Sequence, residues 1–371
     1  MAANQNHEDA QYILGIIYFY GRKIPQDINK SLYYLQLAAN QNHPASLSML
    51  GSIFYSGEVV PRDINKAIYY LSTAADQKDL SALFNIGNIY CEGKYIERDI
   101  NKAIHCLTIA ANQNFTEAQY RLGFIYYEGE YIERNINKAI QFFTLAANKN
   151  HKDAQYVLGV IYYERKYIER DINKAIHYFS LAANQNHESA QYKLGLIYHT
   201  YVIDINRSIY YYTLASNKNN KYAQYNLGVI YYEKKYGVFD INKSIIYLSL
   251  ASKNDDPRAQ HLLGVIYYEG IHVVRDINKS LYYLSLAANK GFEDALFYLG
   301  GIYYNGDYVK KDIKKAIKYL LLAADNNSDK AQFYLAMFYF NGVYLLKDIT
   351  KALYYLSISA NQNFSLAHYC L

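Results

Sequence analysis

The chain has 371 residues, a formal net charge of +5 and only 19% charged residues. Because nucleic-acid-binding proteins are usually far more basic, we expect no nucleic-acid partner. Three cysteines are too few for a disulfide framework, and no run of 18 or more apolar residues is present to span a membrane. Because the first residues also lack the basic and apolar regions of a signal peptide, we expect a cytoplasmic protein.

The first 43 residues predict two helices joined by a short loop. Residues 8–20 carry apolar side chains at helical spacing and stop before Gly21, a residue type that commonly terminates a helix in a left-handed conformation. Asp27 is a suitable N-cap for a second helix. From Ser31 to Ala39 that helix places small and apolar residues at i, i+3, i+4, i+7 and i+8, which is typical of a half-buried amphipathic helix.

This helix pair recurs along the whole chain with a period of 36 residues, shortened once to 33. A small residue near the middle of each first helix marks the repeat: Gly15, Gly51, Gly87, Gly123, Gly159, Gly195, Gly228, Gly264, Gly300 and Ala336. A fixed period of this size indicates stacked repeats that bury their apolar stripes against their neighbours. Positions are numbered below from this central residue, so that Tyr12 is at position −3 and Phe19 at position +4 of the first repeat.

The predicted repeats are 8–43, 44–79, 80–115, 116–151, 152–187, a short 188–220, 221–256, 257–292, 293–328, 329–364 and a partial 365–371. Each second helix is preceded by an N-cap residue, namely Asp27, Asp63, Asp99, Asn135, Asp171, Asp204, Asp240, Asp276, Asp312 or Asp348. The glycine after the first helix is replaced by Arg165, Tyr201 and Lys234 in three consecutive repeats. We therefore expect a local change of curvature around residues 196–206.

The recurring pattern A-x-x-x-L-G-x-x-Y-x-x-G followed by D-x-x-K-A-x-x-Y-x-x-A-A resembles the Sel-1-like repeat. One repeat carries it as Ala295, Leu299, Gly300, Tyr303, Gly306, Asp312, Lys315, Ala316, Tyr319, Ala323 and Ala324. The resemblance covers nearly the whole chain. It implies an all-α fold, a right-handed α/α superhelical solenoid of helix pairs related to tetratricopeptide repeats, with residues 1–371 as a single solenoid. It also implies a scaffold or adaptor that binds another protein or an extended peptide along its concave face.

An aromatic ladder on the first helices is the candidate binding surface. Positions −3 and +4 are seven residues apart and share a helix face, and tyrosine offers a large contact area with a polar tip. In the resembled superfamily, first helices line the concave surface. The candidate protein-binding residues are Tyr12, Phe84, Tyr120, Tyr127, Tyr156, Tyr163, Tyr192, Tyr225, Tyr232, His261, Tyr268, Phe297, Tyr304 and Phe333. The alternative interpretation is that these rings pack adjacent first helices together, and one ring can do both.

Several residues interrupt or accompany this ladder. Ser48 and His261 interrupt position −3, whereas Cys91 and His199 interrupt position +4. The intervening positions −2 and +1 vary between repeats, which indicates either partner specificity or drift on a solvated face.

No paired carboxylates, nucleophile motif or converging metal ligands stand out, so the sequence predicts no catalytic residue, metal or cofactor. The alternative hypotheses are a small-molecule binder or weak enzyme around Cys91 and Cys106, and a drifting array without a fixed partner.

Overall fold

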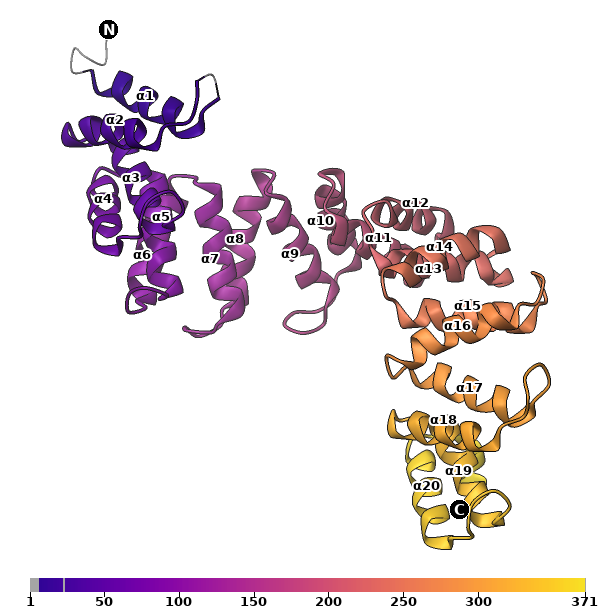
Figure 1. Cartoon of the computed structure of the whole chain (residues 1–371). Helices are drawn as coiled ribbons and strands as arrows, with labels where there is room; N and C mark the ends of the chain where they lie inside the picture. Colours follow the sequence, from indigo (N-terminus) through magenta and orange to yellow (C-terminus); the bar gives the residue numbers. More distant parts are fainter. Residues whose placement is uncertain (1–6, 23, 371) are drawn as a thin grey trace. The chain divides into compact units, whose positions relative to one another are not determined.

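The computed structural model describes residues 7–22 and 24–370, and within these ranges the regular structure is entirely helical (Figure 1). The chain divides into two compact units, Met1–His187 and Glu188–Leu371, called here the N-terminal half and the C-terminal half. In each half a first helix packs against the second helix of its repeat, which in turn packs against the next first helix. The predicted all-α class and the helix pairs are therefore confirmed, whereas a single solenoid over both halves stays a prediction.

Helices of the N-terminal half follow the predicted repeats. Its first helices are α1 (Glu8–Tyr20), α3 (Pro44–Ser56), α5 (Leu80–Glu92), α7 (Thr116–Glu128) and α9 (Lys152–Tyr163). Its second helices are α2 (Ile28–Asn40), α4 (Ile64–Asp76), α6 (Ile100–Asn112), α8 (Ile136–Asn148) and α10 (Ile172–Asn184).

The C-terminal half repeats this order. Its first helices are α11 (Glu188–Thr200), α13 (Lys221–Tyr232), α15 (Pro257–Glu269), α17 (Glu293–Asn305), α19 (Asp329–Asn341) and the short α21 (Ser365–Cys370). Its second helices are α12 (Ile205–Ser216), α14 (Ile241–Lys253), α16 (Ile277–Ala288), α18 (Ile313–Asp325) and α20 (Ile349–Asn361), and a 3-10 turn, η2 (Lys234–Tyr236), follows α13.

The predicted caps set these helix ends. Every member of the N-cap column accepts a hydrogen bond from the backbone N–H three residues later, at 2.9–3.0 Å. The predicted glycines after the first helices adopt left-handed conformations, for example Gly21 at φ 62°. Where Arg165 and Lys234 replace that glycine, the first helix ends one residue earlier at an extended residue, Glu164 or Glu233. In the shortened loop Ile203 takes the left-handed conformation instead, at φ 57°.

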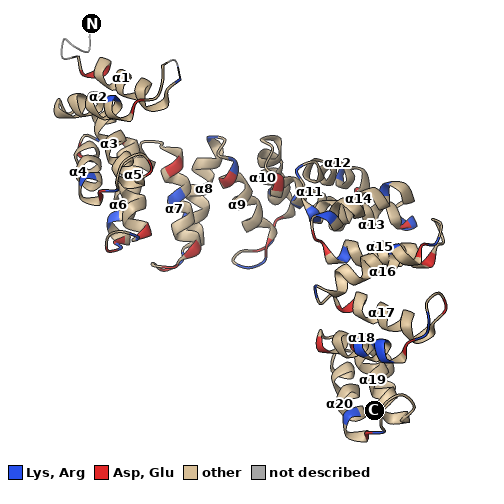
Figure 2. Ribbon diagram, in the orientation of Figure 1, with Lys and Arg blue, Asp and Glu red and all other residues tan. Residues whose placement is uncertain are grey.

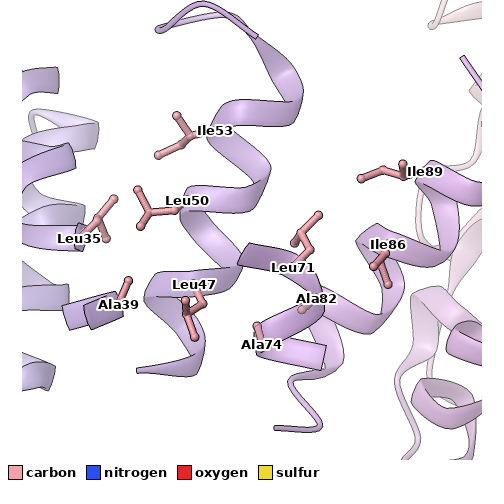
Figure 3. Close-up of a cluster of buried hydrophobic side chains, with 10 residues drawn as sticks. All are labelled: Leu35, Ala39, Leu47, Leu50, Ile53, Leu71, Ala74, Ala82, Ile86 and Ile89. Atoms are coloured by element: carbon pink, nitrogen blue, oxygen red, sulfur yellow. The ribbon is translucent and has the colours of Figure 1, made fainter. Parts of the chain in front are cut away.

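A buried residue of the second helix packs over the central glycine in the nine repeats that have one. Leu35, Leu71 and Phe143 are fully buried in this position. The second helices also contribute small residues such as Ala39 and Ala74 to the same interior, which Figure 3 shows for the repeats around α3 and α4. Each core cluster extends from one repeat into the next, so that burial of apolar surface joins neighbouring repeats.

Buried glutamines at position −4 form a second link between repeats. The side chain of Gln119 donates from Nε2 to the carbonyl oxygen of Ala111 at 3.1 Å, and Gln155 bonds Ala147 in the same way. Both side chains are only 1% exposed. Since these carbonyls lie at the end of the preceding second helix, each bond satisfies a terminal helix carbonyl and holds consecutive repeats in register.

A set of stacked rings, present in every repeat except the third, was not predicted from the sequence. The aromatic residue at position +3 lies nearly parallel to an aromatic residue of its own second helix, as in Tyr126 and Phe142 at 5.9 Å and 3°. The lysine three residues after the N-cap lies over the same ring, with Lys138 Nζ 5.0 Å from the Tyr126 centroid. Position +3 is aromatic in all ten repeats, a regularity that the sequence alone displays.

Candidate functional site

The ladder rings at position −3 pack between repeats. Tyr120 stacks on His151 at 4.4 Å and lies 5.8 Å from Phe143 of its own second helix. Tyr156 stacks in the same manner on His187, and Tyr12 contacts His43. The rings of this column in the N-terminal half, which includes Phe84, are half-buried. Each of these rings therefore contacts the residue that immediately precedes the next first helix.

The rings at position +4 make equivalent contacts at the other end of the first helices. Tyr127 lies edge-on to Tyr167, in the loop of the following repeat, at 5.7 Å. Tyr163 contacts Phe179 of its own second helix. Burial raises the pKa of Tyr120 and of Tyr127 above the usual tyrosine value. These rings therefore pack within the solenoid, and the ladder as a binding surface stays a prediction.

In the C-terminal half the candidate residues also pack against neighbours. Tyr192 contacts the rings of Tyr212 and Tyr222. Tyr268 contacts Tyr298 and Tyr308, and Tyr304 contacts Phe338 and Tyr344. Phe297 contacts Tyr334, and Phe333 contacts Phe364. The guanidinium of Arg258 lies 4.2 Å from the Tyr225 centroid and is held by the buried carboxylate of Asp256. Tyr232 packs against the core around Leu248. Burial raises the pKa of Tyr192, Tyr225 and Tyr232.

Two interruptions of the ladder are filled by imidazoles. His199 donates or accepts a hydrogen bond with the Tyr236 hydroxyl at 2.8 Å, and His261 lies 5.5 Å from the Phe292 ring. Burial lowers the pKa of both histidines. At these two positions an imidazole therefore replaces the aromatic ring of the ladder.

The other two interruptions, Ser48 and Cys91, each line a cavity of the N-terminal half. By repeat geometry, a ring at position 48 would lie against Asp79, as Tyr120 lies against His151. Because serine stands there, a cavity of about 410 Å³ opens across α1, α3 and α5, and both Ser48 and Asp79 line it. The cavity is called here the Ser48 groove. Tyr12, Phe19 and Tyr20 contribute aromatic rings to its lining, and Ser52 and Asn85 contribute polar groups.

The second cavity lies at Cys91, where the aromatic ring that is usual at position +4 is missing. A ring at position 91 would lie against Tyr131, as Tyr55 lies against Tyr95 and Tyr127 against Tyr167. Instead a cavity of about 210 Å³, called here the Arg121 pocket, is lined by Cys91, Arg98, Ile100, Arg121, Phe124, Ile125, Glu128, Glu130 and Tyr131. Cys91 is 8% exposed and is a free thiol. Cys106, also a free thiol, is not among these lining residues.

The variable positions +1 and −2 meet between neighbouring first helices. The side-chain amide of Asn85, at position −2, donates to the Ser52 hydroxyl, at position +1 of the preceding repeat, at 3.0 Å. In the next repeats the same two positions hold Asn88 and Arg121. Ser52, Asn85, Asn88 and Arg121 are therefore polar at positions where other repeats carry mainly apolar side chains. Sequence variation had marked these positions, and the hydrogen bond between Ser52 and Asn85 shows that positions +1 and −2 of consecutive repeats can be neighbours.

Charged residues lie mostly at helix starts and in loops of both halves, and most of the chain carries none (Figure 2). Among the described residues, no three His, Cys, Asp or Glu side chains are grouped so as to hold a metal ion. The part of the chain that the structure describes also includes no helix long and apolar enough to cross a membrane.

Comparison with known proteins agrees with the geometry. The Sel1 repeat family matches residues 8–43, 44–79, 80–115, 116–151, 152–187, 188–220, 221–256, 257–292, 293–328 and 329–364. A protective antigen of uropathogenic Escherichia coli with an SLR fold is 26% identical, with a TM-score of 0.81, over 99% of this chain and 79% of that one. A Sel1 repeat protein from Oxalobacter formigenes is 28% identical, with a TM-score of 0.66, over 82% of this chain and 89% of that one.

No curated protein matches the sequence. The ten consecutive family matches and the two solved structures nevertheless agree with the observed helix pairs, their capped ends and their central glycines. The resemblance found in the sequence is thereby confirmed, and the fold is a tetratricopeptide-like, all-α solenoid. The chain belongs to the Sel1 repeat family.

Proposed function

We propose that this protein is a non-catalytic scaffold or adaptor that binds another protein, as an extended segment, along the first helices of its N-terminal half. The observation that carries the proposal is the Ser48 groove, because it is an open space on the ladder face at a position where most other repeats carry an aromatic ring. Sel1 repeat solenoids typically act as scaffolds for other proteins, which supports a protein partner.

The lining of the Ser48 groove suits a polypeptide. The rings of Tyr12 and Phe19 offer apolar contact, while the side-chain amide of Asn85, which donates one N–H to Ser52, offers polar groups for backbone hydrogen bonds. The groove crosses three first helices, and helices pack about 8–10 Å apart. Two such steps correspond to about five or six residues of extended chain at roughly 3.3 Å per residue. A short extended segment therefore fits the groove better than a folded surface does.

The ladder rings contribute to this surface only in part. Because Tyr156 packs on both Phe179 and His187, changing it to alanine removes a contact between repeats as well as a contact surface. Loss of binding in such a variant does not separate the two roles. Filling the groove separates them, since it blocks the space without removing a core contact.

Site-specific photo-crosslinking tests the proposal. A benzophenone amino acid replaces Tyr20 at the edge of the Ser48 groove in one variant and Tyr69 on the second helix α4 in another. Both side chains are well exposed, Tyr20 to 56% and Tyr69 to 65%. The expected result is a defined crosslinked partner from position 20 and none from position 69. Crosslinking from position 69 alone would place the binding surface on the second helices and contradict the proposal.

Ser48→Tyr is the matched competition control. Tyrosine is the residue found at this position in Tyr12 and Tyr120, so the solenoid accommodates it, and its ring would fill the groove. The crosslink from position 20 should disappear in this background while the circular dichroism of the helices is unchanged. Persistence of the crosslink with Ser48→Tyr would show that the partner does not enter the groove.

A further inference from the structure

We infer that the Arg121 pocket binds a carboxylate group of the bound polypeptide, through the Arg121 guanidinium. This inference rests on the proposed function, since it concerns the same face of the N-terminal half. It assigns a chemical class to part of the partner: an acidic side chain or a C-terminal carboxylate.

The guanidinium of Arg121 is incompletely satisfied. Its Nη2 donates to the Cys91 thiol at 3.4 Å, and its Nε is buried without a hydrogen-bond partner. Among residues 7–22 and 24–370, Arg121 forms no ion pair. A partly buried cation without a counter-charge is unfavourable, so the site is complementary to an anion.

The fold does not require arginine at this position. Position −2 is occupied by Ile13, Val157 and Leu262 in other repeats, whose helices have the same length to within one residue. The guanidinium therefore adds a charge where the solenoid accepts an aliphatic side chain. Arginine also presents its N–H groups in a planar fork that matches a carboxylate.

A second unsatisfied polar atom lies on the preceding helix. The side-chain oxygen Oδ1 of Asn88 is buried and has no hydrogen-bond partner. Repeat geometry places position +1 of α5 beside position −2 of α7, since the equivalent side chains of Ser52 and Asn85 are hydrogen-bonded at 3.0 Å. Oδ1 of Asn88 can accept a hydrogen bond, whereas Arg121 can donate one to an anion. A peptide supplies both partners, a backbone N–H for Asn88 and a carboxylate for Arg121.

The remaining charges of the pocket favour a single negative charge. Arg98 is already engaged, because it donates to the carbonyl oxygens of Cys91 and Glu92 and lies 3.8 Å from the Tyr131 centroid. Glu128 and Glu130 are exposed at the rim. A phosphate group, with a charge of about −2 at pH 7, would meet these two carboxylates, so a carboxylate suits the pocket better. The volume of about 210 Å³ accommodates such a group.

Side-chain NMR of arginine tests the inference on the full-length protein. Three peptides serve as probes: acetyl-AAAD-amide with an acidic side chain, acetyl-AAAA with a free C-terminus, and the neutral acetyl-AAAA-amide. The expected result is a saturable shift of the Arg121 Nε–H signal with one or both carboxylate peptides and none with the neutral peptide. The two acidic probes distinguish a side-chain carboxylate from a C-terminal one.

Internal and mutational controls make the assignment specific. The Nε–H signals of Arg134 and Arg275 should not move, because both groups already donate to backbone carbonyls and neither lines the pocket. Arg121→Leu, which copies Leu262, should weaken binding of the carboxylate peptide about tenfold, the effect of losing a charge-assisted hydrogen bond. Cys91→Tyr, which fills the pocket with the usual ring of position +4, should have the same effect. Lys193→Gln removes a charge from position −2 in the C-terminal half and should leave binding unchanged.

Two results would overturn the inference: an unshifted Arg121 signal with both carboxylate peptides, or equal binding by wild-type protein and Arg121→Leu. If either occurs while crosslinking from position 20 persists, the proposed function stands and only the carboxylate assignment fails. If Arg121 binds carboxylate while no protein partner crosslinks, the proposed function fails and the pocket is a small-anion site.

Discussion

A Cβ atom built on Gly123 would lie 2.7 Å from Cδ1 of Phe143, so the first helix α7 rests directly on the buried ring of α8. We predict that Gly123→Leu forces these helices apart and destabilises the protein by about 1–3 kcal/mol, the usual cost of overpacking a core. Urea denaturation followed by circular dichroism measures the change.

Gly301 provides the matched control for this prediction. It also lies within a first helix, but a Cβ atom there would have no neighbour within 4 Å. Gly301→Leu should leave stability unchanged or raise it by up to about 1 kcal/mol, because leucine has the better helix propensity. Equal destabilisation by both substitutions would mean that the central glycines are not the contact points.

Acid should destabilise the protein through its helix caps. Backbone N–H donors, with those of Lys30 and Lys174 as examples, hold the pKa of the Asp27 and Asp171 carboxyls below the ordinary value of 3.8, and Asp63, Asp99 and Asp240 behave alike. Because these folded-state values are lowered, the caps contribute their full stability above the ordinary value. That contribution is lost as the pH falls through the lowered values.

Urea midpoints measured between about pH 5 and pH 2 test this dependence. Asparagine already caps α8 as Asn135 and accepts the same hydrogen bond, at 3.0 Å. Replacing the five aspartates by asparagine should therefore preserve the helices and flatten the acid limb of the profile. An unchanged acid limb in that variant would assign the pH dependence to other carboxyl groups.

Cys106→Phe should stabilise the third repeat. Cys106 stands where the other second helices carry a ring that stacks on position +3, so Tyr90 has no aromatic partner of this kind. Restoring the stack should contribute about 0.5–1.5 kcal/mol and raise the melting temperature. Cys106→Ser controls for loss of the thiol and should give no increase. A lower melting temperature for the phenylalanine variant would contradict the stacking account.

Much of the fold follows from the sequence because its determinants are local and repeated. Asp27 caps the helix that starts at the next residue, Gly21 ends the one before it, and the 36-residue period extends both features along the chain. The stacked pairs such as Tyr126 and Phe142 were equally available from the regularity of position +3.

The candidate site depends on what surrounds each gap in the ladder, which the sequence pattern does not define. His199 and Cys91 interrupt the same column, but only the histidine fills its space, by bonding Tyr236. Ser48 leaves a cavity larger than the Arg121 pocket, because neither Ser48 nor Asp79 has a ring where Tyr120 and His151 stack. Likewise, whether Nε of Arg121 has a hydrogen-bond partner depends on how the side chains of α5 and α7 pack together, which the sequence pattern does not define. Side-chain packing between repeats therefore decides where the binding surface lies.

The most direct test of the central claim is the dissociation constant of the crosslinked partner for three proteins: wild type, Ser48→Tyr and Tyr69→Ala. Filling the Ser48 groove should weaken binding at least tenfold, a difference of about 1.4 kcal/mol, while the change on the second-helix face should have no effect. Unchanged affinity for Ser48→Tyr together with weakened binding by Tyr69→Ala would contradict the assignment of the partner surface to the first helices.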